Sequence, residues 1–171
     1  YAHNHGAVTI SGAGGGYDAF DDDDTLPGWL QDAGYDTFFI GKYLNGYKAG
    51  SAVPPGWSEW RGTEDPTTYN FVRPTISVNG TSTSYEQYST DVFSDLTVDL
   101  LDDPQRRQKP WYMWVNYVAP HHGGPDAPDD PVNTHPEDPK PLKTTTPAPE
   151  DENTFESLTL PDKPNMFEQD V

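Results

Sequence analysis

Two residues of this sequence, Lys42 and His121, each follow an apolar run directly and carry groups suited to anion chemistry. Lys42 comes after the aromatic run 35–40 and a glycine, and His121 comes after the run 111–118 and an Ala-Pro pair. A lysine ammonium is a point charge with three donors. A histidine donates a hydrogen bond or a proton near neutral pH. Together they could hold a tetrahedral oxyanion and stabilise its leaving oxygen, although either residue alone is commonly just a solvated strand end.

Two strands must position these side chains. The sequence predicts a helix at Leu26–Ala33, with Thr25 as its N-cap, and then a buried strand at Tyr35–Ile40. A second helix is predicted over 86–102, followed by a strand over 111–118 whose continuous apolar run is typical of a central strand buried on both faces. If the two strands are parallel, Lys42 and His121 emerge at the same carboxyl edge, where open α/β sheets bind ligands.

The remaining segments are less regular. Residues 1–24 are predicted as loop and 46–68 as turn-rich. Strands are expected at 69–72 and 75–78, with Asn79-Gly80 as a hairpin turn signal, and Ser89 or Thr90 would cap the second helix. From residue 120 onward the chain holds 11 of its 18 prolines and has almost no periodicity, so we expect a long loop region over 123–171.

Composition narrows the function classes. The formal net charge of −18 argues against nucleic acid or an anionic membrane surface as a partner, because both need a basic footprint. No apolar run approaches the length of about 18 residues that a membrane span needs. The chain has no cysteine, which excludes disulfides, zinc–thiolate sites and thiol nucleophiles within these residues.

Two further clusters could bind metal but are better explained otherwise. His3 and His5 have i, i+2 spacing, but the intervening Asn and following Gly favour a turn. The run Asp21–Asp24 lacks the alternating spacing of calcium loops and is better interpreted as a solvated acidic turn before a helix. We therefore predict no metal ligand in this chain.

Several segments together resemble the sulfatase family, in that family's order. The segment 34–42, with Gly-Tyr-Asp-Thr and a closing Gly-Lys, resembles the second sulfatase signature, and Gly-Lys-Tyr-Leu-Asn at 41–45 looks like the variant of N-acetylglucosamine-6-sulfatases and extracellular heparan endosulfatases. The other matching segments are 3–5, 53–57, 69–80, 88–92 and 109–121. The likeness covers residues 1–122 well and continues faintly to the end, which makes 1–122 part of a sulfatase catalytic domain and 123–171 a loop region of the same domain.

The resemblance implies an alkaline-phosphatase-like α/β/α sandwich, of which this chain is a central fragment, and hydrolysis of sulfate esters on sugars, as in N-acetylglucosamine-6-sulfatases. It assigns catalytic roles to Lys42 and His121, and substrate binding to Asn45, His5 and His122. A position where many sulfatases carry histidine is Leu44 here, so Asn45 would be its substitute. Trp57, Trp60 and Tyr69 could stack on sugar rings, but loop and core packing explains them better.

The same resemblance implies a calcium ion and a formylglycine made from Cys or Ser, and it places both outside these residues. No cysteine and no Ser-x-Pro/Ala-x-Arg motif occurs in the chain. We therefore expect the 171 residues alone to be inactive, and the intact protein to be secreted or extracytoplasmic. Two alternatives stay open: a non-catalytic sulfatase-like protein that binds an anion or a glycan, and a phosphodiesterase or phosphonate hydrolase of the same superfamily.

Overall fold

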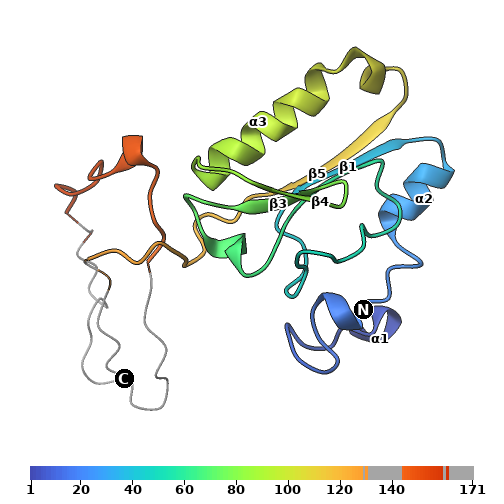
Figure 1. Cartoon of the computed structure of the whole chain (residues 1–171), viewed down its shortest axis with the longest axis horizontal. Coiled ribbons are helices and arrows are strands. Elements are labelled where there is room, and N and C mark those ends of the chain that lie inside the picture. Colours follow the sequence, from blue (N-terminus) through green and yellow to red (C-terminus); the bar gives the residue numbers. More distant parts are fainter. Residues whose placement is uncertain (129, 131–143, 160, 162–171) are drawn as a thin grey trace.

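A five-stranded sheet with helices on both faces forms the body of the molecule (Figure 1). The computed structural model describes residues 1–128, 130, 144–159 and 161; much of the predicted loop region 123–171 therefore lies outside the described residues. The α/β class is confirmed. In chain order the elements are α1 (Ala2–His5), a 3-10 turn (Tyr17–Ala19), α2 (Leu26–Asp32), β1 (Asp36–Gly41), β2 (Glu59–Thr63), a 3-10 turn (Thr67–Tyr69), β3 (Thr75–Val78), β4 (Thr81–Ser84), α3 (Ser89–Asp102), a 3-10 turn (Pro104–Arg107), β5 (Trp111–Asn116) and a 3-10 turn (Pro149–Asp151).

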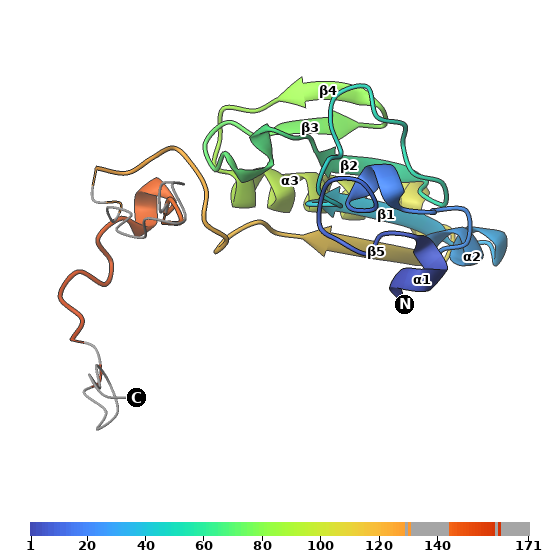
Figure 2. The ribbon, with the colours of Figure 1, turned by 90° about the horizontal axis from the view of Figure 1, so that it is seen from below.

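Strand β1 lies between β2 and β5 in the sheet, whose order is β4-β3-β2-β1-β5 (Figure 2). It pairs in parallel with β2 on one side and with β5 on the other. The hairpin β3–β4 extends the sheet beyond β2 by antiparallel pairing. The chain leaves the hairpin, runs through α3 and returns as β5, so β1 and β5 have the parallel arrangement that a shared edge for Lys42 and His121 requires.

The sheet has a core on each face because successive side chains of β1 point to opposite sides. Phe38 and Ile40 pack with the buried face of α3, which contributes Val92, Phe93, Leu96 and Leu100. Phe39 lies in a second, aromatic cluster with Tyr47, Trp57 and Trp60. Full burial of each such side chain stabilises the fold by about 1.5–3 kcal/mol. Figure 1 shows α3 on one side of the sheet and α1 with the N-terminal segment on the other.

Both predicted helices occur where the sequence predicts them, α2 with the predicted N-cap residue and α3 with a different one. Thr25 is the N-cap residue of α2, yet its side chain makes no capping hydrogen bond. The N-cap of α3 is Tyr88, not Ser89 or Thr90. Ser89 is the first residue of the helix and is buried. Its backbone N–H donates to the carbonyl of Phe71 at 2.7 Å, which ties the start of α3 to the preceding loop.

The predicted hairpin is displaced by one strand. Asn79 and Gly80 form the two-residue turn, and both have left-handed backbone angles. The strands that flank this turn are β3 and β4, whereas 69–72 is not a strand. There, the Asn70 Oδ1 accepts the backbone N–H groups of Val72 and Arg73 and closes a local turn.

Three other expectations are wrong. Residues 1–24 contain the short helix α1 and a 3-10 turn. The turn-rich region 46–68 contains β2, whose buried Glu59 is paired with Asn79 and Arg106, partners far along the chain. Strand β5 is not buried on both faces: it is an edge strand among the described residues, and Trp111 and Trp114 are 47% and 44% exposed.

Candidate functional site

The end of β1 is locked to the end of β5, and this contact places Lys42. The Lys42 backbone N–H donates to the Asn116 carbonyl at 3.0 Å, and the Asn116 side-chain amide donates back to the Lys42 carbonyl at 3.0 Å. A side chain at Gly41 would collide with Asn116, because its Cβ would lie 2.0 Å from the carbonyl oxygen. The Gly-Lys step therefore lets the two strand ends approach closely, and it leaves Lys42 at the carboxyl edge of the sheet, as predicted.

The Lys42 ammonium is half-buried and fixed by two acceptors. It donates to the Tyr43 carbonyl at 2.9 Å and to the Asn45 Oδ1 at 2.6 Å. Desolvation by burial lowers the pKa of Lys42 from its usual range, and the negative charge of Asp65 acts in the opposite direction. Because an ammonium has three donors, one N–H remains for a ligand.

Tyr69 joins Lys42 to the histidines. Its hydroxyl is 3.3 Å from the Asn45 Oδ1, and its ring centroid is 5.8 Å from the Lys42 Nζ. The same ring stacks on His121, with centroids 4.5 Å apart, and lies 6.5 Å from the ring of His122. Burial, and then the charge of Asp65, raise the pKa of the Tyr69 phenol, so it stays a neutral hydrogen-bond donor.

The two histidines are exposed and sit on the turn after β5. The His121 backbone N–H donates to the Val118 carbonyl, and its Nδ1 lies 2.7 Å from the His122 carbonyl. Since a carbonyl only accepts, Nδ1 carries a hydrogen, and Nε2 is left to hold or release a proton. The Thr145 hydroxyl, from the C-terminal segment, donates toward the carbonyls of Pro120 and His121 at 2.6 and 2.9 Å.

His5 joins the lysine side of the site. It lines a pocket of about 330 Å³ together with Lys42, Tyr43 and Asn45. Its Nδ1 accepts the Ala7 backbone N–H at 3.3 Å, and its ring packs on Phe20. No contact between His5 and the His121–His122 turn occurs among the described residues.

Sequence reasoning missed the importance of Tyr69 and did not single out Asp65 or Asn116. Asp65 follows β2 and accepts the Gly46 backbone N–H at 2.8 Å, so it holds the loop that carries Asn45. Recognising β2 as a strand would have placed Asp65 and Tyr69 at the same edge as Lys42. Trp57 and Trp60, by contrast, are buried in the aromatic cluster, where they cannot reach a sugar ring.

The described residues do not form a metal site. Within residues 1–128, 130, 144–159 and 161, no group of three or more His or acidic side chains could hold an ion. His3 is exposed and stacks on Tyr1. In the acidic run, Asp24 accepts the indole N–H of Trp29, and Asp21 accepts a backbone N–H two residues on. In the part of the chain that the structure describes, no helix is long and apolar enough to cross a bilayer.

Comparison with known proteins gives a consistent family. A family model described as Sulfatase matches residues 1–159. Over 186 aligned residues, the chain is 31% identical to an arylsulfatase of Volvox carteri, with 100% of this chain and 28% of that protein covered. It is 36% identical over 144 residues to the N-acetylglucosamine-6-sulfatase of Homo sapiens, with 75% and 25% covered. Proteins named extracellular sulfatases are among its other relatives.

A solved structure has the same fold. BT4656, determined in complex with its substrate D-glucosamine-2-N,6-O-disulfate, superposes with a TM-score of 0.70 at 22% identity, covering 99% of this chain and 28% of that one. The chain thus spans about a quarter of the length of the arylsulfatase, the N-acetylglucosamine-6-sulfatase and BT4656.

Proposed function

The chain belongs to the sulfatase family, and we propose that the sheet edge around Lys42 binds the sulfate group of a sulfated sugar during hydrolysis of its ester. The observation that carries this proposal is the half-buried Lys42 ammonium, held by two acceptors with one donor left. A preorganised cation in a partly water-excluded site stabilises negative charge far better than one in solvent. N-acetylglucosamine 6-sulfate is our preferred substrate, since relatives at 36–39% identity carry the name N-acetylglucosamine-6-sulfatase.

The other polar side chains take complementary roles. Lys42 binds a sulfate oxygen, and Asn45 keeps the ammonium in place. Protonated His121, held through its Nδ1, donates from Nε2 toward the leaving sugar oxygen. His5 and His122 line two different pockets beside the site and bind the substrate. Two parts of the family's chemistry are not assigned to this chain: it has no cysteine to become formylglycine, and the described residues do not fit calcium.

The test uses the complete protein, by which we mean the product of the whole reading frame that encodes this sequence. Sulfate release from N-acetylglucosamine 6-sulfate is measured for the wild type, for Lys42→Ala and for Lys48→Ala, a control at an exposed lysine six residues on. We expect Lys42→Ala to lower kcat/KM by about 10²–10³-fold, as the loss of one anion-stabilising donor does, and Lys48→Ala to leave it unchanged.

The alternatives give different results. Turnover of bis(p-nitrophenyl) phosphate in preference to the sulfate ester would favour a phosphodiesterase. Binding of inorganic sulfate without turnover of any ester would favour a non-catalytic anion or glycan binder. Wild-type turnover in Lys42→Ala would overturn the assignment of the site. We also propose an extracytoplasmic location, supported by the relatives named extracellular sulfatases.

A further inference from the structure

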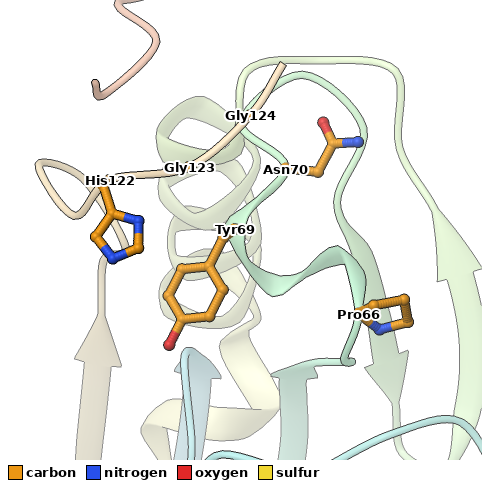
Figure 3. Close-up of a pocket in the computed structure, with 6 residues that line it drawn as sticks. All are labelled: Pro66, Tyr69, Asn70, His122, Gly123 and Gly124. Carbon is orange, nitrogen blue, oxygen red and sulfur yellow. The ribbon is translucent and has the colours of Figure 1, made fainter. Parts of the chain in front are cut away.

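A pocket of about 320 Å³ lies beside Tyr69 (Figure 3), whose ring centroid is 5.8 Å from the Lys42 Nζ. We propose that this pocket is a subsite for an uncharged saccharide ring of the substrate, distinct from the place where sulfate binds. This inference rests on the function proposed above and deepens it. The lining residues are Pro66, Tyr69, Asn70, His122, Gly123 and Gly124.

The lining suits a neutral, hydroxyl-rich ligand. None of the six residues is an acid, a lysine or an arginine, although the whole chain carries a net charge of −18. The ring of Tyr69 and the ring of Pro66 provide apolar surface, which the C–H face of a sugar can contact. Ligand sites typically combine such surface with a few placed polar groups.

Asn70 and His122 supply those polar groups. The Asn70 Oδ1 accepts two backbone N–H groups, at 3.2 and 3.0 Å, so the orientation of the amide is fixed and its NH₂ remains as a donor. The ring nitrogens of His122 have no hydrogen bond to any described residue, and the side chain is exposed at the pocket. A donor amide and an imidazole can together satisfy sugar hydroxyls.

Tyr69 also sets the distance between this pocket and the anion site. Its ring lines the pocket, while its hydroxyl reaches Asn45 and its centroid lies 5.8 Å from the Lys42 Nζ. The neutral pocket and the Lys42 cation therefore both lie next to the same side chain. A sugar that carries one sulfate group has this pattern, with a polar uncharged ring next to a single anionic substituent.

The two glycines at the back of the pocket allow a clean test. A Cβ on Gly123 would lie 2.4 Å from the Tyr69 carbonyl, so substitution there would disturb the fold. A Cβ on Gly124 would meet only the Asp126 nitrogen, at 4.0 Å, and the residue lines the pocket. Gly124→Val therefore adds a side chain at the wall of the pocket, and its Cβ has no close contact. Gly28→Val is the matched control, because the space around that glycine, on α2, is also open.

The experiment titrates uncharged N-acetylglucosamine into the complete protein by NMR or calorimetry, and measures KM for N-acetylglucosamine 6-sulfate and for p-nitrophenyl sulfate. We expect Gly124→Val to raise both the Kd of the neutral sugar and the KM of the sugar sulfate about tenfold, a typical effect of a changed pocket shape. Gly124→Val should not change the KM for p-nitrophenyl sulfate. Gly28→Val should match the wild type in all three measurements. His122→Ala, at an exposed residue, should weaken neutral-sugar binding without affecting folding.

The outcomes separate the two proposals. If Lys42-dependent sulfatase activity is present but Gly124→Val and His122→Ala leave sugar binding and KM unchanged, the subsite is wrong and the proposed function stands. If neutral sugar binds and Gly124→Val abolishes this binding, but no sulfate ester is turned over, the subsite stands and the proposed function fails. Failure of the wild type to bind the neutral sugar, with equal KM in all variants, overturns the subsite.

Discussion

The two halves of the candidate site are built in different ways. The lysine half, Lys42 and Asn45, grows directly from the end of β1, which two hydrogen bonds to Asn116 lock to the end of β5. The histidine half, His121 and His122, is exposed on a turn that is supported by ring stacking on Tyr69 and by the Thr145 hydroxyl from the distant C-terminal segment. The sheet therefore fixes the position of the ammonium, while loops fix the position of the imidazole that we propose as the proton donor.

This difference has consequences for catalysis. A cation that the sheet holds in place needs no reorganisation when the anion arrives, which is the condition for strong electrostatic stabilisation. An imidazole on a turn can adjust to the leaving group, but its position depends on contacts with segments far along the chain. Damage to the lysine half should therefore affect stability and binding together, and loss of the His121 imidazole should affect the reaction without affecting stability.

The largest expected effect comes from separating the strand ends beneath the lysine half. Gly41 has a φ of 98°, and its Cβ would lie 2.0 Å from the Asn116 carbonyl oxygen. We expect Gly41→Ala to lower the free energy of unfolding by about 3 kcal/mol or more, because backbone strain and a clash add. Gly46→Ala is the control: its φ is 89°, but nothing lies within 4 Å. Urea unfolding should show a loss of only about 1 kcal/mol there, and equal losses would argue against a strand-end lock.

The next largest effect concerns the histidine half. His121→Ala should lower kcat for N-acetylglucosamine 6-sulfate by about 10²-fold, as the loss of a general acid does. The effect on p-nitrophenyl sulfate should be much smaller, since its leaving group needs no proton, and the free energy of unfolding should not change. His3→Ala, at an exposed histidine of α1, is the control. A loss of equal size for both substrates would show that His121 holds the sulfate instead.

A smaller effect tests how Lys42 is held. Asn45→Ala removes the acceptor 2.6 Å from the ammonium and the partner of the Tyr69 hydroxyl. Because a hydrogen bond to a charged group contributes about 1.5–3 kcal/mol, we expect inorganic sulfate to inhibit at least about tenfold more weakly. Asn45→Asp keeps an acceptor but adds a negative charge beside the anion, so it should weaken inhibition further. Inhibition in Asn45→Asp that matches the wild type would mean that only the position of the ammonium matters.

The sequence predicted the lysine half better than the surroundings of the histidine half, because the first depends on local signals and the second on contacts between distant segments. Apolar runs and a glycine end point identify β1, α2 and α3, so Lys42 and its edge position could be found from local signals. The shared edge with His121 needed only the parallel crossover. Tyr69 and Asp65 could not be found in this way, because their positions depend on β2, and the polar Glu59 in that strand is stabilised by Asn79 and Arg106, which are remote in sequence.

The exposure of β5 was missed for a related reason. Its continuous apolar run indicates burial on both faces, but a run of this kind reveals nothing about which strands flank it. The Trp114 ring lies against Phe39 and Trp57, yet the side chain is still 44% exposed. Which strands pair with β5 depends on the whole sheet. The hydrophobic pattern of one strand therefore cannot show whether that strand lies at the centre or at the edge of the sheet.

The smallest expected effect is a shift of pH dependence in the lysine half. Burial lowers the pKa of Lys42, and the charge of Asp65 partly opposes this. Because only the protonated ammonium attracts sulfate, affinity should fall as the pH rises through the Lys42 pKa, and it should fall at a lower pH than for an ordinary lysine.

Asp65→Asn keeps an acceptor for the Gly46 N–H but removes the opposing charge, so the pKa of Lys42 should fall further and the midpoint of the alkaline decline should move to lower pH. Sulfate affinity at neutral pH should rise slightly, since one repulsive charge is gone, and the midpoint is therefore the diagnostic quantity. Asp91→Asn, at an exposed residue of α3, should leave it in place. A midpoint that stays fixed or moves to higher pH in Asp65→Asn would show that Asp65 supports only the loop, and that the lysine half depends on burial alone.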